Sequence, residues 1–182
     1  VITNSEGSIM AQWGNPRYLT YARSTVKPLQ ALAIIESGAV QQYGLSPEEI
    51  AIICASHRGE QLHVDTVTSI LNKIGMSSAD LRCAVNDNCS GKHAGMLVLS
   101  TVLGISARHY YELKHPVQLL IAQTIASICE VDVEQLITAV DGCGVPVFGM
   151  PIQQLAKGFA RLGTPLPDFH STRMDACHTI IK

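Results

Sequence analysis

The sequence feature that most constrains the fold is a series of apolar segments with helical spacing. In each segment apolar residues recur three or four positions apart, which places them on one face of a helix. The first spans Thr25 to Ser37, and Gly38 follows at a position that favours a helix end. Further helices are predicted from Gly59 to Gly75, Gly91 to Leu103, Pro116 to Glu130, Pro151 to Leu162, and from Ser171 onward.

Shorter runs predict strands between some of these helices. VITN and SIMAQW flank Ser5, Glu6 and Gly7, which indicates a hairpin. Ser46 and Glu49 have the spacing of a capping box, and the apolar run IAIICAS at 50–56 is interpreted as a buried strand. A further strand is predicted in EQLITAV at 134–140. Together these elements predict a fold of the α/β (α+β) class.

Composition excludes several classes of function. The 182 residues are 47% hydrophobic and 15% charged, which is enough for one sizeable core. The formal net charge is −2 and the basic residues are scattered, so we expect neither a nucleic-acid surface nor an anionic-lipid surface. No apolar stretch reaches the roughly 18 residues of a membrane span, and the first residues lack a secretory signal. We therefore expect a cytoplasmic protein with a small polar ligand.

The six cysteines are dispersed along a chain without a signal peptide, which favours free thiols or metal ligands over a disulfide framework. Cys54 and Cys129 lie inside apolar runs, where cysteine usually acts as a small hydrophobe. Both are predicted to be packing residues.

The first motif with chemical potential is RSTVKP at 23–28, in which Ser24 and Lys27 are three positions apart. Pro28 has no N–H, so the carbonyl of Ser24 loses its helical donor and Ser24 must lie at or just before the helix start. A desolvated lysine one turn later can take the proton of the serine and produce an acylating nucleophile. The alternative is a helix N-cap followed by a surface lysine.

The second motif, ASHRGEQLHV, places Ser56 beside His57, Glu60 and His63. The spacing of the last three is not the His-Glu-x-x-His pattern of zinc proteases, so a metal site here is not expected. A polar cluster directly after the predicted strand fits a site at a strand end. The alternative is an exposed, N-capped helix.

The third motif, NCSGKHAG at 88–95, combines a thiol, an amine and an imidazole at a predicted helix start. Cys89, Lys92 and His93 have the spacing of one helical face. The motif lacks the glycine and hydroxyl positions of a phosphate loop. Cys143 in AVDGCGVP at 139–146 offers another thiol, so a zinc site is one interpretation. A helix start with a buried thiol and a solvated lysine is the other.

The order and gaps of RSTVKPLQ, ASHRGEQLHV, NCSGKHAGML and DGCGVPVF carry more information than any single motif. The chain resembles the bacterial and plant L-asparaginase family typified by the inducible Rhizobium enzyme, over residues 1 to about 180. That resemblance implies a serine β-lactamase-like sheet flanked by helices. It also implies two Ser–Lys pairs, of which Ser24 with Lys27 is one and Ser56 belongs to the other. The lysine of the second pair would lie beyond Lys182, so we expect residues 1–182 to be a single partial domain without its C-terminal part.

The resemblance also implies roles for the remaining motif residues. Zinc would be held by Cys89, Lys92 and Cys143, as an organiser of the pocket. The carboxylate and ammonium groups of an amino acid would be bound by Arg23, His93 and Asp141. A homodimer is implied as well.

The resulting hypothesis is hydrolysis of L-asparagine to L-aspartate and ammonia through an acyl-enzyme. Ser24 would be the nucleophile, Lys27 its base, and Ser56 a group that relays protons or polarises the amide. Two alternatives stay open. One is another acyl-serine amidase or a penicillin-binding-like hydrolase, which would not need the metal. The other is a non-catalytic fragment that binds zinc or an amino acid.

Overall fold

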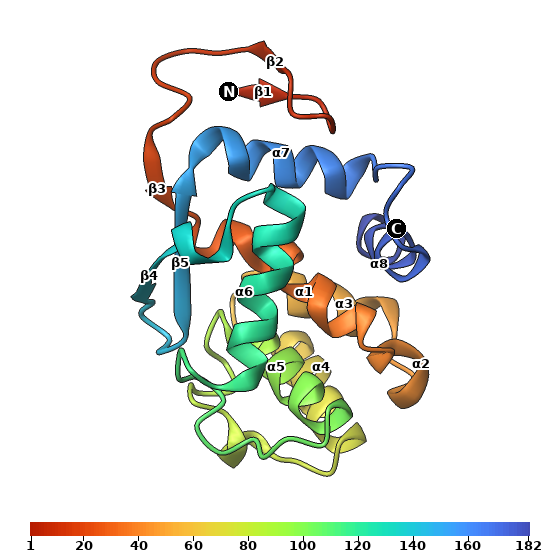
Figure 1. Cartoon of the computed structure of the whole chain (residues 1–182). Helices are drawn as coiled ribbons and strands as arrows, with labels where there is room; N and C mark the ends of the chain where they lie inside the picture. The colour runs from red at the N-terminus through yellow and green to blue at the C-terminus, as the bar shows by residue number, and fades with distance from the viewer.

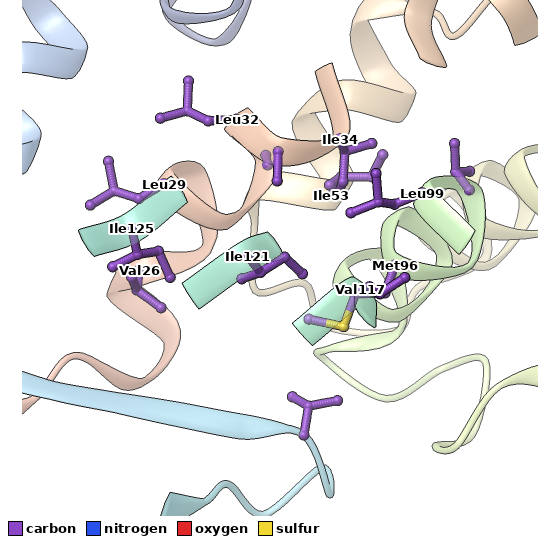
Figure 2. Packing of buried hydrophobic residues seen from close by; sticks show 14 of the residues in the cluster. Val26, Leu29, Leu32, Ile34, Ile53, Met96, Leu99, Val117, Ile121 and Ile125 are labelled. Carbon is purple, nitrogen blue, oxygen red and sulfur yellow. The ribbon is translucent and has the colours of Figure 1, made fainter. Parts of the chain in front are cut away.

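Helix α1 (Lys27–Glu36) lies at the centre of the chain, and four other helices pack around it. The computed structural model describes residues 1–182 (Figure 1). The neighbours of α1 are α3 (Pro47–Cys54), α5 (Ser90–Val102), α6 (Pro116–Cys129) and α8 (Ser171–Ile181). Figure 2 shows Leu29 of α1 close to Ile125 of α6, and Ile34 close to Ile53 of α3 and Leu99 of α5.

The remaining elements lie around this group. Three more helices are α2 (Ala39–Tyr43), α4 (Gln61–Lys73) and α7 (Ile152–Gly163), and short 3₁₀ turns occupy Arg23–Val26, Ser78–Asp80 and Val133–Gln135. The strands are β1 (Ile2–Thr3), β2 (Ile9–Ala11), β3 (Leu19–Tyr21), β4 (Ile137–Val140) and β5 (Pro146–Pro151). Eight helices beside antiparallel strands confirm the α+β class. None of the helices combines the length and apolar character that a membrane crossing requires.

The strands form two separate antiparallel sheets. β1 and β2 make the hairpin predicted around Ser5 to Gly7, and this hairpin lies against α7 (Figure 1). The second sheet has the order β3-β5-β4, with Tyr21 opposite Gly149 and Val140 opposite Pro146. Residues 141–145 therefore form the tight connection of the β4–β5 hairpin, and this connection carries Asp141 and Cys143.

The interpretation of residues 50–56 as a buried strand is wrong. Residues 47–54 form helix α3. The capping box decides the outcome: the hydroxyl of Ser46 accepts a hydrogen bond from the backbone N–H of Glu49, and the Glu49 carboxylate accepts one from the backbone N–H of Ser46. Pro47 in the first turn also favours a helix. A short apolar run buried on most sides has no clear period, so its pattern does not separate strand from helix.

The helices that were predicted from the sequence are confirmed within a few residues. Several short elements, in contrast, were not predicted. β3, β5 and α2 belong to this group. β5 reads PVFGMP, with a proline at each end and an internal glycine, which disfavours a strand prediction. Its conformation depends on pairing with β3 and β4, which come from distant parts of the chain.

Helix α5 lies unusually close to α3 because glycine replaces a side chain at the contact. A Cβ atom on Gly91 would lie 2.2 Å from the backbone oxygen of Ile52. One turn later, a Cβ on Gly95 would lie 2.7 Å from Ile34 and 2.8 Å from Ile53. The glycines of the third motif therefore bring its other residues next to the segment that follows α3.

Glu49 provides the first test of this packing. Its side chain is 4% exposed and accepts hydrogen bonds from Lys73 Nζ at 2.6 Å and Ser69 Oγ at 2.7 Å, in addition to the capping bond. Burial alone would raise the pKa of Glu49, but the bonds from Lys73, Ser46 and Ser69 outweigh it and lower the pKa. A carboxyl with a lowered folded-state pKa stabilises the fold above its unfolded pKa, and this contribution is lost as the pH falls through the folded pKa.

We expect Glu49→Gln to lower the free energy of unfolding at pH 7 by about 2–4 kcal/mol, because Lys73 loses its charged partner. The variant should also lose part of the acid sensitivity that the wild type shows below pH 4.5, the ordinary pKa of a glutamate side chain. Urea denaturation at several pH values measures both effects. Glu48→Gln is the matched control at an exposed neighbouring position. Equal stability of the Glu49→Gln variant and the wild type would show that the contact between Glu49 and Lys73 does not stabilise the fold.

Candidate active site and metal centre

Lys27 has a buried amine at the start of α1. The residue is 1% exposed. Its Nζ lies 2.8 Å from the carbonyl oxygen of Ala55, 3.0 Å from that of Asn88, and 2.9 Å from Ser56 Oγ. The amine thus joins α1 to two other segments, one after α3 and one before α5.

The surroundings of Lys27 lower the pKa of its amine. Burial lowers the pKa of Lys27, and the positive charge of Lys92 lowers it further, while Cys89 opposes the shift. The amine of Lys27 donates to the carbonyls of Ala55 and Asn88 and to the hydroxyl of Ser56, so three acceptors surround it.

Ser24 lies in the 3₁₀ turn before α1, as the proline in the motif requires. Its carbonyl accepts a hydrogen bond from the backbone N–H of Lys27. Its side chain is exposed and makes no hydrogen bond, and the amine of Lys27 is directed to Ser56 instead. The sequence places Lys27 one turn after Ser24, but the buried carbonyls of Ala55 and Asn88 draw the amine away from it.

Arg23 and Asp141 form an ion pair beside this turn. The Arg23 Nη2 and Asp141 Oδ1 atoms are 3.1 Å apart, with the arginine side chain 71% exposed and the aspartate side chain 8% exposed. Arg23 has φ 44°, in the left-handed region that a non-glycine residue seldom adopts. Such a conformation is retained only where the surroundings determine it, and it often marks functional sites.

Cys89, Lys92 and Cys143 meet beside the ion pair. Lys92 Nζ lies 3.3 Å from Cys143 Sγ and 4.0 Å from Asp141 Oδ2. The interaction with Cys89 lowers the pKa of the Cys143 thiol, and the same interaction, together with burial, raises the pKa of Cys89. Cys54 and Cys129 lie in or against the hydrophobic core as predicted, and burial raises the pKa of each to about 12.

These donors are of types that zinc binds, and they lie close together. The ligand atoms of Cys89, Asp141 and Cys143 all lie within 4.8 Å of one another. Cys143 Sγ is 3.9 Å from Asp141 Oδ2 and 3.3 Å from Lys92 Nζ. Bond lengths to tetrahedral zinc imply separations between ligands of about 3.3–3.8 Å. Thiolates with a nitrogen or oxygen donor are also ligands that zinc prefers.

His93 is fully buried in α5, one helical turn after Cys89. Its Nδ1 lies 2.7 Å from the hydroxyl of Tyr110, which also accepts the backbone N–H of Arg82 at 2.9 Å. His93 lies close enough to Cys143 to lower its pKa, but no hydrogen bond of standard geometry joins the two, and Nε2 has no partner. A buried polar atom without a partner is rare and indicates a ligand or water position.

Ser56 lines a pocket of about 300 Å³ together with His57, Leu62 and His63. The rings of His57 and His63 stack with their centroids 5.1 Å apart. Because residues 47–54 form helix α3, the second motif follows the end of a helix and not of a strand. Helix α3 packs against α4 and α5 (Figure 1).

Several groups of this site were not predicted from the sequence. The carbonyls of Ala55 and Asn88 have no sequence signal, because any residue type supplies a carbonyl. Tyr110 lies 17 positions after His93 and outside all the motifs. Ser90 lies inside the third motif, where it contacts His57, but no sequence pattern indicated this contact.

The hydroxyl of Tyr110 is hydrogen-bonded to both His93 and Arg82, and this contact provides a second test. We expect Tyr110→Phe to lower the free energy of unfolding by about 1–3 kcal/mol, because it leaves the buried Nδ1 of His93 without a partner and removes the acceptor of the Arg82 N–H. Urea denaturation measures the change. Tyr111→Phe is the control, since that hydroxyl contacts only the exposed His109. A loss that is equal in the two variants would refute this supporting role.

Comparisons with known proteins identify the family of the chain. A search of curated proteins returned no match. A family model described as L-asparaginase II matches residues 1–87 and 84–182, which together cover the whole chain. The matched range includes all four motifs and every residue of the site. The chain therefore belongs to the L-asparaginase II family, a family of hydrolases that act on amides.

Proposed function

We propose that the site hydrolyses the side-chain amide of L-asparagine through an acyl-enzyme on a serine. The family match supports an amidohydrolase, and one observation supports the Ser–Lys chemistry in particular. This observation is the buried amine of Lys27, which has a lowered pKa and a serine hydroxyl at 2.9 Å. A neutral amine beside a hydroxyl is a suitable general base at ordinary pH.

The proposed reaction uses two serines with different positions. Ser24 remains the predicted nucleophile, because its hydroxyl is exposed beside the Arg23–Asp141 pair. Ser56 would pass the proton of Ser24 to Lys27, since Ser56 is the hydroxyl bonded to the amine. The Ser24 oxygen attacks the amide carbon, the carbon–nitrogen bond breaks, and the proton held by Lys27 leaves with ammonia. Water then hydrolyses the ester to aspartate.

Arg23 and Asp141 would bind the two charged ends of the amino acid. The guanidinium can pair with the substrate carboxylate and the aspartate with the ammonium group. In the structure the two residues neutralise each other at 3.1 Å, so a bound zwitterion would replace one ion pair by two. His93, with its free Nε2, would provide a further polar contact.

The proposed metal is zinc, held by Cys89, Lys92 and Cys143. When bound, zinc would supply a fixed positive charge that keeps these side chains together. The chain's own groups carry the proton transfers in the scheme above. A homodimer and a cytoplasmic location remain predictions from the sequence.

The turnover prediction concerns Ser24. We expect the purified chain to release ammonia from L-asparagine, and Ser24→Ala to reduce this release by at least about a thousandfold. Ser56→Ala should reduce it by about a hundredfold or more, because the proton relay is lost. Ser37→Ala, at the other end of α1, is the control with unchanged turnover.

Each alternative has its own outcome in this assay. Release that is retained in Ser24→Ala would refute the nucleophile assignment. Release from other amides but not from asparagine would identify a different acyl-serine amidase. Binding of asparagine without release would identify a non-catalytic binding protein.

A separate prediction concerns the metal. We expect about one zinc ion per chain after gel filtration, measured by plasma mass spectrometry, because three to four donors form the site. Cys143→Ala and Lys92→Met should each lose most of the metal. Cys54→Ala is the control, since that thiol packs against the core. Zinc that is retained in the Cys143→Ala variant would place the metal elsewhere.

A further inference from the structure

The position of Ser56 depends on two segments that are distant in sequence. Lys27 Nζ binds the carbonyl of Ala55 and the hydroxyl of Ser56 in the segment after α3. It also binds the carbonyl of Asn88 in the segment before α5. The three contacts can form together only if residues 55–60 and 84–90 keep a fixed separation.

His57 is the side chain that joins these two segments. The residue is 7% exposed, and its Nε2 lies 3.0 Å from Ser90 Oγ at the start of α5. Its Nδ1 accepts the backbone N–H of Gly59 at 3.1 Å. The hydroxyl of Ser90 in turn donates to the carbonyl of Val85 at 2.6 Å.

The bonding pattern fixes the form of the ring. Because Gly59 donates to Nδ1, this nitrogen has no proton, and Nε2–H donates to Ser90. The resulting chain of hydrogen bonds runs from Gly59 through His57 and Ser90 to Val85. Gly59 donates, His57 and Ser90 each accept one bond and donate one, and the Val85 carbonyl accepts. Burial lowers the pKa of His57, and His63 and Lys27 lower it further, which agrees with a neutral ring.

The backbones of the two segments touch where the ring joins them. A Cβ atom on Gly59, which has φ 70°, would lie 2.3 Å from the carbonyl oxygen of Asn86. The N–H of His57 itself donates to the carbonyl of Asn88 at 3.4 Å. Because the segments are in contact here, a shift at the His57–Ser90 contact would also displace the neighbouring Ser56.

We propose that His57 is a positioning residue for the reaction, which holds Ser56 against Lys27 by tying residues 55–60 to the first turn of α5. The inference rests on the proposed function for its effect on turnover. Lys92 lies in this first turn and Cys89 directly precedes it, so His57 also links the serine to the proposed metal ligands. Nothing in this role requires the ring to contact the substrate.

His57→Asn isolates the contact between the segments. An asparagine side chain reaches the N–H of Gly59 as Nδ1 does, but it is too short to reach Ser90. We expect this variant to lower kcat by about 10- to 100-fold, because small displacements of reacting groups have effects of this size. KM should change less than about threefold, since the substrate-binding groups stay in place.

Ser90→Ala removes the same contact from the other side, and it should show the same division between kcat and KM. The double variant should be no slower than the slower single variant, because both changes break one interaction. His63→Asn is the control, because it removes the stacked ring and leaves the contact with Ser90 intact. A fall in kcat as large in His63→Asn as in His57→Asn would overturn the proposal, and so would an unchanged kcat in His57→Asn.

Amide hydrogen exchange gives a readout that does not depend on turnover. In His57→Asn we expect faster amide exchange both in residues 55–60 and in residues 84–90. Exchange in the helices away from these two segments should be unchanged. Faster exchange in 55–60 alone would overturn the proposal. If the wild type releases no ammonia, the proposed function fails while the exchange result still decides the role of His57.

Discussion

The arrangement of the site depends on the buried amine of Lys27. The amine enters the interior at the start of α1 and has its hydrogen-bonding capacity filled by groups from two other segments. An unpaired amine at this depth would be costly, so the contacts with Ala55, Ser56 and Asn88 must form as the helices pack. The requirement that stabilises this packing also places a serine hydroxyl beside a base.

The helical core and the small sheet supply different parts of the site. Helices α1, α3 and α5 bring Lys27, Ser56 and Cys89 together, and the glycines of α5 allow the close approach to α3. The β4–β5 hairpin brings Asp141 and Cys143 from a distant part of the chain. Neither part alone would contain both the proton-transfer groups and the thiol cluster.

Most of the site residues could be predicted from the sequence, but their partners could not. Ser24, Lys27 and Cys89 lie in motifs whose order and spacing identify the family. The pairing of Lys27 with Ser56 follows from long-range packing, and local spacing pointed to Ser24 instead. Residues 50–56 were mistaken for a strand because a run that is apolar on most sides has no clear period, although the capping box before it indicated a helix.

The central claim is that a serine of this site becomes acylated by asparagine with Lys27 as the base. The most direct measurement is rapid acid quenching of the chain with L-asparagine, followed by peptide mapping by mass spectrometry. The account predicts an aspartyl ester on the peptide that contains Ser24, and no adduct when Lys27 is replaced by methionine. An adduct on Ser56 would reverse the roles of the two serines. Ammonia release without any ester in the wild type would contradict the acyl-enzyme account.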